Sequence, residues 1–162
     1  MDNELGSRTR KFYGKYKDYI LFNKNIIISG TAAFFIGALF TQLYSKQDSN
    51  NLTNSIATLS IEYGIYIPLF ALLFYIDNKY RYINPVTQKK DYSRIKCDLK
   101  KLVAAFSISE LIYSVAKLSI HYELLQRSIE PYQASMIASL AAWCLFLIAI
   151  NMGVKVVKLF RT

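Results

Sequence analysis

A stripe of polar side chains follows one face of the apolar segment 102–122. Its members recur at spacings of three, four, three and four residues, which aligns them along one side of an α-helix: Ser107, Glu110, Ser114, Lys117 and His121. An ionisable side chain inside a membrane is costly unless it faces protein or water. The stripe therefore predicts either a polar pathway for an ion, a proton or a charged head group, or a set of contacts that holds helices together.

Glu62 is the natural partner of Lys117. It lies near the start of the apolar segment 56–76, which runs in the opposite direction to 102–122, so both residues reach the same depth. Glu110 lies near the middle of its segment, with no counter-charge at its own depth. We therefore predict a Glu62–Lys117 pair. Two alternatives remain: Lys117 reaches back toward Glu110, which is otherwise protonated, or Lys117 extends to the membrane surface.

Four apolar segments indicate a membrane protein. The chain has 162 residues and is 53% hydrophobic, with a formal net charge of +9. Each segment approaches the ~20 residues that cross about 30 Å of hydrocarbon: 26–44, 56–76, 102–122 and 134–151. They form two hairpins on either side of the polar loop 77–101. The sequence predicts an all-α polytopic bundle of four transmembrane helices, with residues 25–162 as the transmembrane domain.

The basic residues are concentrated in three segments beside the apolar runs. Of the 20 Lys and Arg residues, six lie in 8–24, eight in 77–101 and three in 152–162, whereas the short loops hold only Lys46 and Arg127. Such a bias marks the cytoplasmic side, so both termini and the loop 77–101 are expected in the cytoplasm. Because the charge forms separate blocks rather than one continuous face, we expect no nucleic-acid partner.

The arm 1–24 contains a candidate interfacial helix. Aromatic and aliphatic residues share one helical face of the segment 8–24, while most lysines lie elsewhere: Phe12, Tyr13, Tyr16, Tyr19 and Ile20. This pattern predicts an amphipathic helix on the membrane surface. It serves either as an anchor that sets the depth of the first span or as an arm that binds head groups or a partner.

Small residues repeat every four positions in the first and fourth spans. They are Ser29, Ala33, Gly37 and Thr41, and then Ala134, Ala138 and Ala142 with Ser135 and Ser139 beside them. Small side chains allow helices to approach closely within a membrane. These stripes predict helix contacts, including self-association or docking to other membrane subunits through the first and fourth spans.

Several kinds of chemistry are not expected from this composition. The single histidine and the two cysteines, Cys97 and Cys144, have no metal-ligand spacing and no disulfide is expected. No nucleophile stands beside a base, no glycine loop could cradle phosphate, and no two carboxylates share a depth. We therefore expect neither catalysis, nor a metal, nor a cofactor.

Each hairpin closes with an asparagine followed by basic and aromatic residues. The first cluster is Asn78, Lys79, Arg81 and Tyr82, and the second is Asn151, Lys155 and Phe160. With the four-span architecture of 25–160, these clusters resemble the GtrA-like family of small membrane proteins. The resemblance implies a role in moving or presenting polyprenyl-phosphate-linked sugars for cell-surface polysaccharide. It assigns anionic head groups to Lys79, Arg81, Asn151, Lys155 and Lys158, and the sugar to the polar stripe with Glu62.

A second hypothesis is a non-catalytic role. The chain would then be a structural or accessory subunit of a larger membrane complex, docked through its small-residue faces and its N-terminal arm. Under the first hypothesis the partners are membrane lipids and a lipid-linked sugar, and under the second they are other membrane proteins.

Overall fold

The computed structural model describes residues 2–47, 50–85 and 87–160, with side chains from residue 16 onward. Four α-helices make up nearly all of this part: α1 (Asp2–Tyr44), α2 (Asn51–Asn78), α3 (Tyr92–Gln126) and α4 (Pro131–Val156). A short 3-10 helix, η1 (Lys79–Tyr82), follows α2. The described residues form no strand beyond an isolated bridge between Ile83 and Lys90. The predicted all-α class is confirmed.

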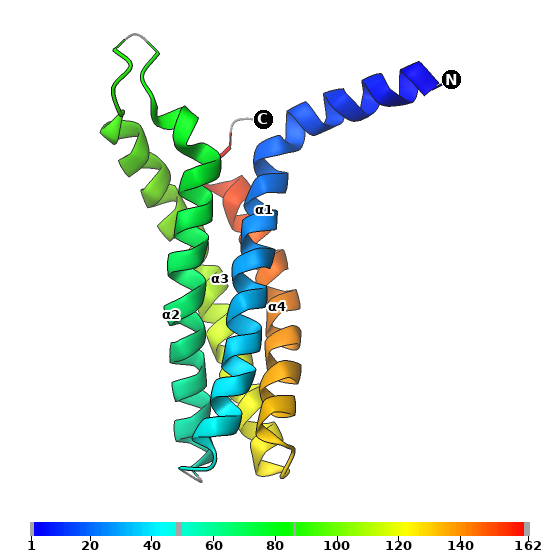
Figure 1. Cartoon of the computed structure of the whole chain (residues 1–162), viewed down its shortest axis with the longest axis vertical. Coiled ribbons are helices and arrows are strands. Elements are labelled where there is room, and N and C mark those ends of the chain that lie inside the picture. Colours follow the sequence, from blue (N-terminus) through cyan, green and yellow to red (C-terminus); the bar gives the residue numbers. More distant parts are fainter. Residues whose placement is uncertain (1, 48–49, 86, 161–162) are drawn as a thin grey trace.

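The helices run alternately up and down (Figure 1). Packing is most extensive within each hairpin, between α1 and α2 and between α3 and α4. Among neighbouring helices it is least extensive between α2 and α3. All four contain segments long and apolar enough to cross a membrane: Tyr16–Tyr44, Asn51–Tyr82, Tyr92–Gln126 and Pro131–Val156. The predicted four spans are therefore confirmed by length and composition.

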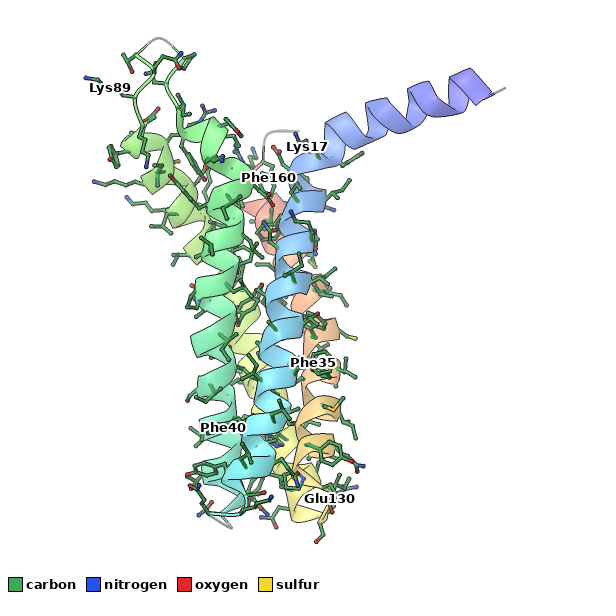
Figure 2. All side chains as sticks on the ribbon, viewed as in Figure 1. Lys17, Phe35, Phe40, Lys89, Glu130 and Phe160 are labelled. Carbon is green, nitrogen blue, oxygen red and sulfur yellow. The ribbon has the colours of Figure 1, made fainter. Side chains whose placement is uncertain are left out.

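Both chain ends lie at the same end of the bundle as the segment between η1 and α3 (Figure 1). Figure 2 shows Lys17, Lys89 and Phe160 at this end and Glu130 at the other. We call the first of these the basic end, because it carries the segments in which the positive charge is concentrated. Both hairpins therefore open toward the same end of the bundle (Figure 1).

Local side chains determine where several helices begin. The Asn50 side chain accepts hydrogen bonds from the backbone N–H groups of Leu52 and Thr53, which caps α2. Asp91 caps α3 by accepting from the N–H of Arg94. Pro131 occupies the first turn of α4, where its missing N–H is not needed. Residues at the loop boundaries thus mark where α2, α3 and α4 begin.

The predicted interfacial arm is not a separate helix, because α1 continues without a break through the expected boundary at residue 24. Phe22 lies in the core, with its ring 5.7 Å from that of Phe70, and so the bundle begins before residue 25. The first part of α1 leans away from the other helices (Figure 1). The side chains of Phe12 and Tyr13 lie outside the described residues, and the amphipathic face remains a prediction.

The small-residue stripes are used inside the chain. Ala134, Ala138 and Ala142 are fully buried, and Ser29 and Thr41 are buried on α1. A side chain at Gly37 would overlap Glu62, and one at Gly30 would overlap Trp143. The stripes therefore bring α1 and α4 close to their neighbours in the same bundle. Docking or self-association through α1 and α4 would need their outer faces instead.

Candidate binding site

Lys117 and Glu62 form an ion pair in the interior of the bundle. Lys117 Nζ lies 2.9 Å from Glu62 Oε1, and the two side chains are 0% and 3% exposed. The same ammonium group donates to the Ser135 carbonyl at 2.9 Å, to Ser135 Oγ at 3.0 Å and to Ser139 Oγ. The predicted pairing is confirmed, and α4 supplies the remaining acceptors.

Glu62 is equally well supplied with donors. The Tyr113 hydroxyl donates to Glu62 Oε2 at 3.0 Å, and Ser139 Oγ donates to Oε1 at 3.2 Å. Gly37 leaves room for this carboxylate against α1. We call these residues the polar centre: Glu62, Tyr113, Lys117, Ser135 and Ser139. Helices α2, α3 and α4 contribute to it, and hydrogen bonds compensate for the burial of both charges.

The rest of the predicted stripe divides between the interior and the surface. His121 is fully buried, with Nε2 3.5 Å from Thr41 Oγ1, and its Nδ1 has no partner among the described residues. Ser114 is half-buried, and its Oγ lies 2.6 Å from the Tyr63 hydroxyl. Ser107 is exposed and donates only to the Val103 carbonyl of its own helix. Ser107 therefore does not join the interior set.

Glu110 lies between these regions and forms no ion pair with the described residues, although its side chain interacts with Tyr63. Its Oε1 is buried without a hydrogen-bond partner among the described residues, and the same holds for the hydroxyl of Tyr66. Both residues line a small internal cavity of about 30 Å³, which Trp143 also lines. The prediction that Glu110 lacks a counter-charge is consistent with this geometry, since Lys117 donates to Glu62, Ser135 and Ser139.

A larger groove opens between α2 and α3, with a volume of about 470 Å³. Its walls are almost entirely apolar and aromatic: Tyr66, Ile67, Phe70, Ala71, Phe74, Tyr75, Tyr82, Ile95, Leu99, Leu102, Val103, Phe106, Ser107 and Glu110. From Ile95 to Glu110 it follows α3 for about 22 Å, at a rise of roughly 1.5 Å per residue. We call it the α2–α3 groove. Its volume is typical of small-molecule sites, which span roughly 300–1,000 Å³.

A basic pocket of about 220 Å³ lies at the basic end. It is lined by Arg81, Arg94, Cys97, Asp98, Lys101 and Leu159. Arg81 contacts Asp98 at 3.5 Å and donates to Asn78 at 2.9 Å, and Lys101 donates to the Lys158 carbonyl at 3.0 Å. The Tyr82 hydroxyl donates to Asp98 at 3.3 Å. Because Tyr82 lines the groove and Asp98 lines the pocket, the two hollows share this wall.

The residues predicted to bind anionic head groups do not form one cluster. Asn151 exchanges hydrogen bonds of 3.0 and 2.9 Å with Asn23, which ties α4 to α1. Arg81 is held by Asp98, whereas Lys79, Lys155 and Lys158 are exposed. The prediction missed Arg94 and Lys101, which line the pocket. Their spacing from Asp98, at four and three residues along one helical face, was the available signal.

Comparison with protein-family models, curated proteins and solved structures finds no match for this chain. The resemblance to the GtrA-like family therefore stays a prediction. Inferences about function must come from the grooves, charges and contacts described above.

Proposed function

We propose that this protein is an integral membrane carrier that binds a phosphate-bearing long-chain lipid and presents or moves its head group. A polyprenyl-phosphate-linked sugar for cell-surface polysaccharide is the ligand that the sequence resemblance implies. One observation carries the proposal: an apolar groove of about 470 Å³ adjoins a pocket that contains three basic side chains.

The groove suits a hydrocarbon chain better than a soluble ligand. It lies between two candidate membrane spans, and Glu110 is the only charged residue among its lining side chains. A chain lying along α3 would cover the exposed side chains of Leu99 and Val103, which are 56% and 58% exposed. Because lipid is as apolar as these side chains, the gain within a membrane would come from close packing of the chain in the groove rather than from removal of surface from water.

The basic pocket suits a phosphate. Arg81, Arg94 and Lys101 outnumber Asp98, which leaves a positive balance next to the shared wall of the groove. Guanidinium groups match the geometry of phosphate oxygens and form strong charge-assisted hydrogen bonds with them. Of the residues that the sequence predicted for this role, only Arg81 lines the pocket.

Filling the groove is the direct test. Ala71→Phe places a ring where Ala71 lines the groove, and the matched control Ala141→Phe adds the same ring on an exposed position of α4. We expect the first variant to lose most of the polyprenyl phosphate that co-purifies with the wild type, measured by mass spectrometry of extracted lipid. Arg94→Ala with Lys101→Ala should also reduce retention. Equal retention in all variants would contradict the proposal.

The orientation belongs to the same proposal. The basic end faces the cytoplasm because its charge follows the positive-inside rule, and the part of α1 that leans away lies on that membrane surface. In a variant with Cys97 and Cys144 replaced, cysteines at Asn51 and Arg127 should react with an impermeant thiol reagent from outside. A cysteine at Lys89 should react only after the membrane is opened. The reverse pattern would invert the orientation.

An accessory subunit is the second candidate. It is favoured by the first part of α1, which extends beyond the other helices and so offers a segment that the bundle does not cover (Figure 1). The mass of the complex purified in mild detergent distinguishes the two functions. A stoichiometric complex with other membrane proteins, without retained lipid, would favour the accessory role.

A further inference from the structure

We infer that the inner end of the α2–α3 groove is a binding site for the ammonium group of an amphiphilic amine. The site consists of the Glu110 carboxylate and the Tyr66 hydroxyl, and the groove holds the apolar part of the ligand. This inference goes beyond the proposed lipid-phosphate function, because it makes no use of the basic pocket.

Two residues that line this end of the groove carry unsatisfied polar atoms. Glu110 Oε1 and the Tyr66 hydroxyl are buried without a hydrogen-bond partner among the described residues, and Tyr66 is 8% exposed. Both residues line the groove as well as the small cavity. Buried polar atoms are normally satisfied, and an exception indicates a missing water, ion or ligand.

The described residues supply no cation to Glu110. Lys117 is the buried lysine nearest along α3, and its ammonium group already donates to Glu62, Ser135 and Ser139. An ammonium group has only three N–H donors, so none is left for a second carboxylate. The Tyr63 hydroxyl contacts Ser114 Oγ and the backbone carbonyl of Glu110. It also interacts with the Glu110 side chain, but as a neutral group that supplies no positive charge. Glu110 is therefore an acid for which the structure leaves the counter-charge open.

The surrounding rings favour an organic cation over an inorganic one. Phe70 and Phe106 have ring centroids 4.9 Å apart, and Tyr66 lies 6.1 Å from Phe70. Aromatic faces attract ammonium groups, and the attraction is stronger where water is excluded. The same rings repel an anion already disfavoured by Glu110. A phosphate head group is thus excluded from this end of the groove, although it fits the basic pocket.

Water alone would satisfy hydrogen bonds without supplying a charge. The cavity of about 30 Å³ has room for a water molecule, which needs roughly 10–15 Å³ by this measure. The two occupants differ in one respect that can be measured: an ammonium group binds through the charge of Glu110, and water does not. Removing that charge without changing the size of the side chain separates them.

Trp143 provides the signal, because it is the single tryptophan of the chain and lines the cavity with Glu110. Decylamine, decanol and decyl phosphate are titrated at pH 7 into the protein in dodecyl maltoside, and the fluorescence of Trp143 is followed. Decylamine is protonated there, since alkyl amines have a pKa near 10. The three probes share a chain and differ in the charge of the head group.

The variants are Glu110→Gln and Tyr66→Phe, with Glu123→Gln as the control. Glu123 is 65% exposed and lies at the far end of α3, so this control makes the same chemical change outside the groove. Thermal unfolding in the same detergent checks that each variant is folded. We expect Glu110→Gln to weaken decylamine binding at least about tenfold. Tyr66→Phe should weaken it less, because a hydrogen bond to a charged group contributes more than a neutral hydrogen bond.

Three results would overturn the inference. The first is equal affinity for decylamine in wild type and Glu110→Gln. The second is a loss of decanol affinity in Glu110→Gln as large as the loss of decylamine affinity. The third is no change in Trp143 fluorescence with any probe. Loss of lipid retention in Ala71→Phe with unchanged decylamine binding would support the lipid function and contradict the amine site. Conversely, amine binding without lipid retention would support the amine site and contradict the lipid function.

Discussion

Two acids on facing helices have opposite surroundings. Glu62 accepts hydrogen bonds from Lys117, Tyr113 and Ser139, whereas Oε1 of Glu110 accepts none from the described residues. Glu62 lies where Gly37 allows α1 to approach closely, and Glu110 lies where α2 and α3 leave a groove. Tight packing thus satisfies one acid within the chain, while the other keeps a buried carboxylate oxygen without a partner among the described residues.

The energetic consequences of the two surroundings differ. A buried pair is stable only while both partners remain, because each one compensates for the desolvation of the other. An acid without an internal cation forms no such pair, and the fold loses little when its charge is removed. Changes at the polar centre should therefore affect stability, and changes at Glu110 should affect binding.

Breaking the pair from the lysine side should have the largest effect. Lys117→Met leaves the Glu62 carboxylate buried without its cation, and we expect a loss of about 3–5 kcal/mol in the free energy of unfolding. Denaturant unfolding of the protein in dodecyl maltoside measures it. The double variant Glu62→Gln with Lys117→Met should recover much of the loss. Additive losses would show that the two residues do not act as a pair.

Closing the space beside Glu62 should have an intermediate effect. A methyl group at Gly37 would overlap the Glu62 side chain, so Gly37→Ala should cost about 1–3 kcal/mol, the usual range for overpacking. Gly64→Ala is the matched control, because nothing lies within 4 Å of the added carbon. There the better helix propensity of alanine should stabilise the protein by up to about 1 kcal/mol. Equal effects at both glycines would contradict the tight contact.

The pair was predictable because its evidence is local. Apolar length sets the spans, alternating direction sets the depth of Glu62 and Lys117, and the spacing along α3 puts Lys117 on a polar face. The groove and the basic pocket were not predictable in this way. They depend on how closely α2 packs against α3 and on where residues 157–160 fold back, which no periodicity records.

The small-residue stripes illustrate the same limit. Their spacing correctly indicates close approach, but a pattern within one helix does not identify the helix that approaches it. Ala134, Ala138 and Ala142 are buried inside the chain's own bundle, although the same pattern also predicted docking to another subunit. The predicted start of the transmembrane domain at residue 25 is too late for a related reason. Phe22 belongs to the aromatic core, although lysines flank it in sequence.

The smallest effect on stability is expected at Glu110, and it distinguishes Glu110 from Glu62 most directly. Glu110→Gln keeps the size of the side chain and removes a charge for which the described residues supply no partner to Oε1. We expect the free energy of unfolding to change by less than about 0.5 kcal/mol, or to rise. The same substitution at Glu62 should lower the free energy of unfolding by several times that amount, because Lys117 would lose its anion.

These two isosteric substitutions can be compared in one detergent and one denaturant series, so differences in side-chain volume do not contribute. A large loss for Glu110→Gln would show that the folded chain depends on a partner for this acid, and it would remove the reason to place a ligand there. A negligible loss, together with weaker decylamine binding, would separate the two acids by role. Glu62 would then serve the fold and Glu110 the ligand, although they lie in the same bundle and line the same cavity.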